Sequence, residues 1–458
     1  MRIGNITLRP YQVVAIDGIV QALNKALFSL DASSTGCGKT FAALGTIARY
    51  DCEFLVIAKA TAVRKWEQAV EDCGLSDRCI RVTTLGRLRN GILSICVKQK
   101  LGRTSTYSFT PLPPGTIIIF DEVQDCGATD SLNAQILIGA RRRRDIGIIG
   151  LSATAIDSPL KMKALGFCLG LHTVHDFYPW CLQNGCGKGP FGLYFRNCEC
   201  DKRGRSGCNC SRDRHLTKIH EHIFPSLGVR VRREDVADQM PQETISVELW
   251  DVGESIPKWM RPYYAAIETK EVEDQDRHEG EVPGGVEKMR ERQKAELMSI
   301  PEMANEIAGD AAEGFSVPVF LNFTASIDAL REGLTNLDCP SEVYDGRHAK
   351  GRQDSLDSFQ NGNLRVLICQ SQAGSASVDM HDMIGGHPRR SYIKPTYKAQ
   401  DMIQMLGRAC RLDAKTPVQQ RIIFSEGTIE ERVYLMAAKK CENIRKINDG
   451  IWADCWGR

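Results

Sequence analysis

Short apolar segments alternate with longer amphipathic ones over the first third of the chain. The runs at 54–58, 116–120 and 146–151 are rich in β-branched residues and bounded by polar ones, a pattern typical of buried parallel strands. Helical spacing lies between these runs, as at 62–74. The alternation of strands and helices predicts a doubly wound α/β domain over residues 1–165.

The alternation returns in the second half of the chain. Apolar runs at 317–323, 365–370 and 421–426 are separated by segments with helical spacing, which predicts a second α/β domain over residues 311–440. Helical spacing continues beyond it and predicts a closing helix over 441–458. No internal sequence repeat relates the two halves, although two domains can share a fold without sharing a sequence.

The middle of the chain does not follow this pattern. Glycine, cysteine and arginine become frequent over residues 166–245, which predicts an insertion rich in Cys and Arg after the first domain. Residues 246–310 are strongly charged and predict a helical linker. A length of 458 residues is too great for one hydrophobic core and agrees with two or three domains.

Composition narrows the class of protein. With 42% hydrophobic and 25% charged residues the chain is typical of globular proteins, and its net charge of +2 gives no global sign of a polyanionic partner. A nucleic-acid surface would therefore be a local basic patch. No run of about 18 apolar residues occurs, and the first residues lack a signal-peptide core. We expect a cytoplasmic protein, in the host cytoplasm if it is viral, with no membrane partner.

The strongest chemical signal lies where a strand-like run meets a helical one. Its members are Thr35, Gly36, Cys37, Gly38, Lys39 and Thr40. Glycines let backbone N–H groups converge on phosphate oxygens, and the following helix directs its positive end at them. Lys39 can reach the β- and γ-phosphates of a nucleotide, and the Thr40 hydroxyl can bind Mg²⁺. A chance glycine-rich turn is the alternative, and Ser33 stands where the common pattern has glycine.

An acidic pair follows the apolar run at 116–120. In phosphate-loop enzymes a carboxylate at this position lies beside the metal. Asp121 would hold Mg²⁺ through water, and Glu122 would orient and deprotonate the attacking water. A solvated acidic pair on the surface is the alternative. The loop and the pair together predict a nucleotide hydrolase that uses Mg²⁺.

These residues resemble the motifs of superfamily-2 helicases. Residues 121–124 (DEVQ) look like the DExH/Q motif, 151–154 (LSAT) like the Ser-Ala-Thr motif, and 404–411 (QMLGRACR) like the QxxGRxxR motif. The segment 8–12 (LRPYQ) looks like the motif whose glutamine reads adenine, and 229–242 like the basic stretch that closes the first half of Swi/Snf-type motors. The resemblance is closest to the Swi/Snf-like branch and to small bacteriophage helicases. It implies an α/β fold of two tandem RecA-like P-loop NTPase domains.

The resemblance implies roles for residues of the first domain beyond the loop and the acidic pair. Gln12 would bind the adenine edge and give a preference for ATP. Ser152 and Thr154 would couple the state of the nucleotide to domain movement. These three positions are taken from the family motifs.

In the second domain the resemblance implies further contacts to the nucleotide. Gln404 would sense the γ-phosphate and the attacking water, and Asp379 would approach the ribose or the metal. Arg408 and Arg411 would act as arginine fingers, because a guanidinium neutralises charge that develops on the transferring phosphoryl group. A solvated basic helix face is the alternative for the two arginines.

The resemblance also implies a path for nucleic acid over both domains. The contacting residues would be Lys59, Thr61, Thr84, Asn322 and Thr324. Small polar and basic groups contact phosphates without reading sequence, so we expect low sequence specificity and strong salt dependence. The basic run at 141–144 either contacts phosphate or is a solvated helix end.

Cysteines cluster in the middle of the chain. Six of the 18 lie between positions 181 and 210. A structural Zn²⁺ could be held by Cys198, Cys200, Cys208 and Cys210. Free reduced thiols are the alternative. Cys37 lies inside the phosphate loop, where a disulfide would disrupt the site, so we expect reduced thiols throughout.

Three functions remain open at this level. The chain could be an ATP-dependent motor that unwinds nucleic acid, a duplex translocase that does not separate strands, or a nucleic-acid-binding scaffold with a weak ATPase site. The scaffold is disfavoured by five intact residues of the ATPase site, namely Lys39, Asp121, Glu122, Arg408 and Arg411. The Swi/Snf resemblance favours DNA as the partner, with RNA as the alternative. We expect a monomer that depends on a partner protein for targeting.

Overall fold

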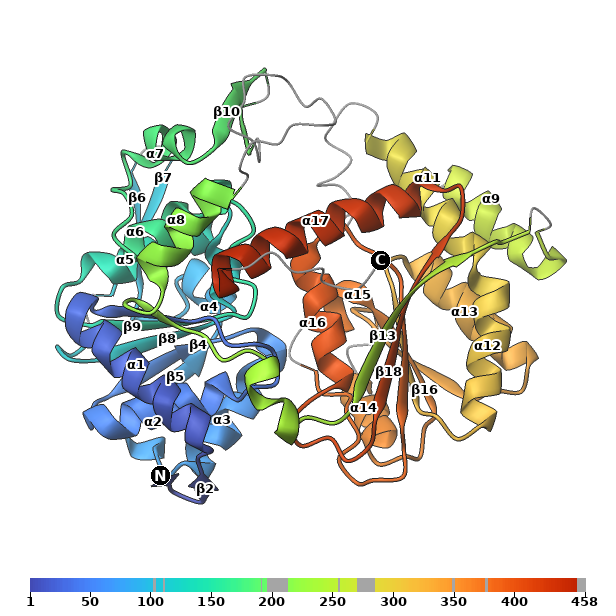
Figure 1. Cartoon of the computed structure of the whole chain (residues 1–458), viewed down its shortest axis with the longest axis horizontal. Helices are drawn as coiled ribbons and strands as arrows, with labels where there is room; N and C mark the ends of the chain where they lie inside the picture. The colour runs from blue at the N-terminus through green and yellow to red at the C-terminus, as the bar shows by residue number, and fades with distance from the viewer. Residues whose placement is uncertain are drawn as a thin grey trace. The chain divides into compact units, whose positions relative to one another are not determined.

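The computed structural model describes residues 1–101, 104–109, 112–190, 192–195, 213–253, 256–269, 285–347, 351–374 and 378–450. The chain forms two compact units (Figure 1). The N-terminal unit contains residues 1–236 together with the end of the last helix from Glu442, and the C-terminal unit contains residues 237–441. Among the described residues, no helix is both long and apolar enough to cross a membrane.

A parallel six-stranded sheet forms the centre of the N-terminal unit. Its strands, in spatial order, are β12 (Gly228–Val229), β3 (Phe28–Asp31), β9 (Gly147–Leu151), β8 (Ile117–Asp121), β4 (Phe54–Ile57) and β5 (Cys79–Thr83). Alternate side chains of one strand enter opposite cores. Along β8, Ile117 and Ile119 join one cluster of buried residues, whereas Ile118 and Phe120 join the other. Both faces of the sheet are therefore covered, as expected for a parallel sheet.

Helices cover the two faces of this sheet (Figure 1). One cluster of buried residues includes side chains of α1 (Pro10–Ala26), α2 (Lys39–Tyr50) and α3 (Val63–Asp72). The opposite cluster includes side chains of α4 (Leu85–Arg89), α5 (Leu132–Arg142), α6 (Lys163–Cys168), α7 (Phe177–Gln183) and α8 (Asp213–Ile223). The described residues of the unit also form three antiparallel hairpins: β1 (Arg2–Ile3) with β2 (Ile6–Thr7), β6 (Val97–Leu101) with β7 (Thr104–Ser108), and β10 (Cys186–Gly189) with β11 (Gly192–Phe195).

The C-terminal unit also contains a parallel six-stranded sheet. Its strands, in spatial order, are β13 (Glu243–Trp250), β18 (Val418–Ser425), β17 (Arg389–Ile393), β14 (Val317–Leu321), β16 (Val366–Gln370) and β15 (Ser341–Tyr344). Its helices are α9 (Arg261–Thr269), α11 (Gly285–Met298), α12 (Ile300–Ala312), α13 (Thr324–Asn336), α14 (Arg352–Gln360), α15 (Ser371–Gly374), α16 (Ala399–Ala409) and α17 (Ile429–Asp449). The prediction of two α/β domains with parallel sheets is confirmed.

The boundaries in the middle of the chain differ from the predicted ones. The described residues between 166 and 236 belong to the N-terminal unit, because apolar side chains such as Phe177 and Leu216 complete its core and β12 extends its sheet. Residues 246–310 are not a separate linker, because β13 is a strand of the second sheet and Leu297 packs in that core. A half-buried edge strand and a charged helix lack the apolar runs that indicate core elements.

The last helix also begins earlier than the predicted 441. It starts at Ile429, and its first part belongs to the C-terminal unit, whereas residues from Glu442 belong to the N-terminal unit. Sequence periodicity cannot reveal this division, because the helical spacing does not change at the point where the packing partner changes.

Two helical glycines give a matched test of the packing. A Cβ on Gly139 of α5 would lie 2.2 Å from the carbonyl oxygen of Tyr107, whereas a Cβ on Gly309 of α12 would meet nothing within 4 Å. We expect Gly139→Ala to destabilise the N-terminal unit by about 1–3 kcal/mol through overpacking. Gly309→Ala should stabilise the C-terminal unit by about 1 kcal/mol, because alanine favours helix. Calorimetric unfolding measures both, and a Gly139→Ala protein as stable as the parent would contradict this packing.

Candidate nucleotide-binding site

The phosphate loop lies between the end of β3 and the start of α2. Gly36 has φ of 86° and Gly38 has φ of 76°, in the left-handed region where glycine is unstrained. The loop leads directly into Lys39 at the first turn of α2, so the positive end of this helix faces the loop. Backbone geometry and helix direction of this kind suit an anion, and binding of phosphate by the loop stays a prediction.

Gln12 lies against this loop, and its contact with adenine stays a prediction. Its Nε2 donates to the carbonyl of Gly38 at 3.4 Å, and a Cβ on Gly38 would lie 2.2 Å from the same nitrogen. The Oε1 of Gln12 accepts from the backbone N–H of Arg9 at 2.9 Å. The start of α1 therefore holds Gln12 at the loop, and only glycine at position 38 leaves room for it.

Lys39 is the cation of the loop. Its Nζ donates to the carbonyls of Ser33 at 2.8 Å and Ser34 at 3.2 Å. Burial lowers the pKa of Lys39, and the negative charges of Asp31 and Glu122 oppose that shift. The ammonium group is therefore surrounded by carboxylates and held on the loop.

The acidic pair Asp121–Glu122 ends β8 on the same sheet. Asp121 Oδ2 accepts from the indole Nε1 of Trp66 at 2.8 Å. Burial, reinforced by the charge of Glu122, raises the pKa of Asp121 to about 6. Glu122 has φ of 55°, a conformation that strains a residue with a side chain, and its carboxylate accepts from the Gln124 amide. Strain of this kind concentrates at functional sites.

These residues fit a magnesium ion held together with substrate phosphates. Asp121 is a half-buried carboxylate whose charged form desolvation disfavours, so a divalent cation would stabilise it. Thr40 follows Lys39 in the first turn of α2 and carries the hydroxyl that would complete the protein's share. Mg²⁺ in phosphate-transferring sites is commonly held by one or two protein groups plus phosphates.

The two predicted coupling residues follow β9, the neighbour of β3. Ser152 is fully buried, and its backbone N–H donates to the carbonyl of Asp31 at 3.0 Å. The Ser152 hydroxyl accepts from the N–H of Thr154 at 3.0 Å. The segment after β9 is thus hydrogen-bonded to the root of the phosphate loop.

Asp31 is a residue of this site that sequence analysis missed. It is 1% exposed, and its Oδ1 accepts from the N–H of Ser33 at 2.9 Å. Its Oδ2 has no hydrogen-bond partner within the described part of the chain, and burial raises its pKa. The sequence places Asp31 at the end of an apolar run, but this position alone did not distinguish a buried site residue from a solvated turn residue.

The segment 227–231 forms a backbone ladder beside the loop. Ala32 donates to the carbonyl of Val229 at 2.9 Å, and Val231 donates to the Ser33 hydroxyl at 3.1 Å. The guanidinium of Arg230 donates to the carbonyl of Ala32 through Nη1. The basic stretch that closes the first half in the family resemblance therefore supports the loop from the side.

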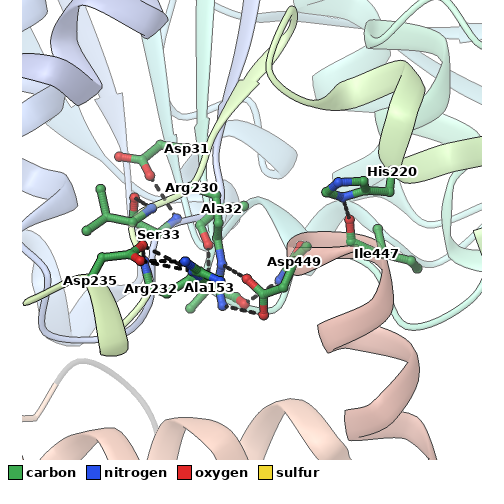
Figure 2. A network of polar contacts seen from close by, with 12 residues as sticks. Asp31, Ala32, Ser33, Ala153, His220, Arg230, Arg232, Asp235, Ile447 and Asp449 are labelled. Carbon is green, nitrogen blue, oxygen red and sulfur yellow. Dashed lines mark hydrogen bonds and ion pairs between the residues drawn. The ribbon is translucent and has the colours of Figure 1, made fainter. Parts of the chain in front are cut away.

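The end of α17 completes this support. Arg230 pairs with Asp449, with 2.7 Å between Nε and Oδ1, and the side chains are 15% and 8% exposed (Figure 2). Asn448 Nδ2 donates to the carbonyl of Ala153 at 2.9 Å, and the carbonyl of Ile447 contacts His220 Nδ1 at 2.8 Å. Residues more than 200 positions away in the sequence thus hold the ends of β3 and β9, a placement that no local pattern indicates.

The predicted nucleotide contacts of the C-terminal unit lie close to one another. Gln404 and Arg408 are one helical turn apart on α16 and are 2% and 5% exposed. Arg411 pairs with Asp379, with 2.6 Å between Nη2 and Oδ1. The N–H of Met380 donates to the carbonyl of Arg408 at 3.0 Å. The four predicted residues therefore form one polar cluster, and their contact with a nucleotide stays a prediction.

Three predicted nucleic-acid residues lie past the carboxyl ends of neighbouring strands. Lys59 and Thr61 follow β4, and Thr84 follows β5. Lys59 Nζ lies 3.8 Å from a carboxylate oxygen of Asp125, and Thr84 caps α4 by accepting from the N–H of Arg87 at 3.2 Å. These residues share the sheet edge with the phosphate loop, and their contact with nucleic acid stays a prediction.

Asn322 and Thr324 occupy the turn between β14 and α13. Asn322 Nδ2 donates to Glu296 Oε2 at 2.7 Å and to the carbonyl of Pro395 at 3.0 Å. Glu296 is fully buried, and burial together with the charge of Glu430 raises its pKa to about 7. The amide hydrogens of Asn322 therefore organise the turn, and contact of Asn322 and Thr324 with nucleic acid stays a prediction.

The four cysteines of the zinc hypothesis, at 198, 200, 208 and 210, lie outside the described residues. Within the described ranges, no group of three or more His, Cys, Asp and Glu side chains could hold a metal ion.

The chain is similar to a family model, to a viral protein and to a solved structure. Residues 5–157 match the family model described as the res subunit of type III restriction enzymes, a span that includes the loop, the acidic pair and Ser152–Thr154. A protein of Acanthamoeba polyphaga mimivirus, named as a candidate ATP-dependent RNA helicase, is 26% identical over 464 residues and covers 97% of this chain and 84% of its own length. The Sulfolobus solfataricus SWI2/SNF2 ATPase core in complex with dsDNA covers 98% of this chain and 94% of its own, at 15% identity and a TM-score of 0.38.

The buried pair between Arg230 and Asp449 gives a testable prediction. Asp449→Ala should lower the free energy of unfolding of the N-terminal unit by about 3 kcal/mol, because it leaves the guanidinium buried without its carboxylate. Asp235→Ala removes the exposed partner of Arg232 and should cost less than about 1 kcal/mol. Urea denaturation followed by circular dichroism compares the two. Equal losses for both variants would contradict a supporting role for the end of α17.

Proposed function

We propose that this chain, which belongs to the superfamily-2 helicases, is an ATP-dependent motor that moves along nucleic acid. One observation carries the proposal. The phosphate loop, the Asp121–Glu122 pair and the Ser152 segment follow three adjacent parallel strands and meet at one edge of the sheet. Ligands of open parallel sheets bind at that edge.

Different residues of the N-terminal unit would have different roles in ATP hydrolysis. The backbone N–H groups of the loop and Lys39 would hold the phosphates, and Lys39 would exchange the carbonyls of Ser33 and Ser34 for phosphate oxygens. Thr40 and Asp121 would hold Mg²⁺, which supplies charge neutralisation to the phosphates. Glu122 would orient the attacking water and accept its proton.

The C-terminal unit would complete the reaction. We propose that Arg408 and Arg411 neutralise the charge that develops on the transferring phosphoryl group, and that Gln404 contacts the attacking water. Arg411 pairs with Asp379, so a phosphate would compete with this carboxylate for the guanidinium. Binding of ATP would then change the contacts of both units, and hydrolysis would reverse the change.

Two kinds of nucleic acid, duplex DNA and RNA, have support as the polymer on which the motor moves. The resemblance of the motifs to Swi/Snf-type motors favours duplex DNA, with movement that leaves the strands paired. The name of the mimiviral relative favours RNA and strand separation. We propose DNA as the track. The predicted contacts on the sheet edges are small polar and basic side chains, which suit phosphates of either polymer.

ATP hydrolysis measured with no nucleic acid, and with single-stranded or duplex DNA or RNA, tests the proposal. We expect duplex DNA to stimulate hydrolysis most. Lys39→Ala and Glu122→Gln should each lower the stimulated rate at least about 100-fold, because one removes a phosphate contact and the other the base.

The matched control is Lys25→Ala, because Lys25 is an exposed lysine in the last turn of α1 and should leave the rate unchanged. Stimulation by RNA alone would indicate that the motor moves along RNA and not along DNA. Hydrolysis that no polymer stimulates would contradict a motor and leave a nucleotide-binding scaffold.

A further inference from the structure

A cavity of the N-terminal unit lies apart from the phosphate loop. It has a volume of about 570 Å³ and lies where the end of α5 meets α6 and α7. α5 ends shortly before β9 begins, so the cavity lies toward the amino ends of the strands. The nucleotide site lies at their carboxyl ends. A separation across the sheet makes this cavity distinct from the site of hydrolysis.

Two arginines of the basic run line the cavity, and no carboxylate within the described residues pairs with either one. Arg141 is 9% exposed, and its Nε donates to the carbonyl of Cys168 at 3.2 Å. Arg144 is exposed and lines the same cavity. Burial lowers the pKa of Arg141, and the charge of Arg144 adds to that effect. A buried charge beside a like charge is costly, and an anion would relieve the cost.

The remaining wall defines what kind of anion fits. Phe167, Leu171 and Trp180 provide apolar surface, and the ring of His172 directs its two nitrogens at the backbone carbonyls of Thr173 and Met162. Asp176 is the acidic residue of the wall, and it accepts a hydrogen bond from the Thr173 hydroxyl at 2.6 Å. The cavity therefore combines a cationic end with an apolar wall, at a size that suits a molecule of one nucleotide rather than a bare ion.

We propose that this cavity binds a nucleotide through its phosphate, with Arg141 and Arg144 as the phosphate ligands and the base against the apolar wall. Guanidinium groups match phosphate oxygens in a two-point geometry. The nucleotide is either free or one unit of a single strand, and the same groups recognise both. A capping role of Arg141 at the end of α6 uses only its Nε and leaves the other donors for the ligand.

Binding of thymidine monophosphate by equilibrium dialysis and of a fluorescein-labelled thymidine decamer by anisotropy tests this proposal. The proteins carry Lys39→Ala, which weakens binding at the loop. We expect Arg144→Gln to weaken binding about tenfold, because it removes a charged phosphate contact. Arg142→Gln is the matched control, since Arg142 is the exposed neighbour on α5 and does not line the cavity.

The outcomes separate the two sources of the ligand. Weaker binding of both probes by Arg144→Gln identifies a free nucleotide, and weaker binding of the decamer alone identifies a unit of a strand. Equal effects of Arg142→Gln and Arg144→Gln, or no effect of Arg144→Gln on either probe, would overturn the proposal. Arg141→Gln should also weaken binding of the probes. Because Arg141 is buried, this variant can be unstable, and the test therefore rests on the exposed Arg144. Neither probe requires hydrolysis, so the result is independent of the motor assay.

Discussion

The parallel pairing of β3 with β9 is the constraint on which the rest of the site depends. It places Asp31 beside Leu151, so that the backbone N–H of Ser152 reaches the carbonyl of Asp31. The phosphate loop begins at one side of this pair and the Ser-Ala-Thr segment at the other. Because β8 pairs with β9 in the same direction, Asp121 arrives at the same edge. Chemistry that is scattered over more than 100 residues of sequence is thereby collected by backbone hydrogen bonds alone.

Burial gives this edge its reactivity. Lys39 is surrounded by Asp31, Asp121 and Glu122, and burial shifts the pKa of Lys39 downward and those of Asp31 and Asp121 upward. Charges that are costly to keep in the protein favour a ligand that brings phosphates and a cation together. The strained backbone of Glu122 also indicates a functional site, since such strain persists only where the surroundings enforce it.

Local patterns predicted the strands, the loop and the acidic pair, because each is encoded in a few consecutive residues. They did not predict the support of the loop by Arg230 and Asp449, because that ion pair joins positions 219 residues apart. The two-residue strand β12 and the half-buried β13 carry too little apolar sequence to be recognised, so their segments were assigned to an insertion and a linker. The helical spacing of α17 could be recognised in the sequence. The sequence did not reveal that the end of this helix belongs to the N-terminal unit.

Movement is the central claim, and displacement of streptavidin from biotinylated DNA and RNA, single-stranded and duplex, tests it most directly. The account predicts displacement that requires ATP and is lost in Glu122→Gln, because that variant keeps the loop but lacks the base for hydrolysis. Displacement at equal rates by the parent and by Glu122→Gln would mean that binding to the nucleic acid, without hydrolysis, is enough to displace streptavidin. Hydrolysis stimulated by nucleic acid without displacement from any substrate would contradict a motor that moves along its track.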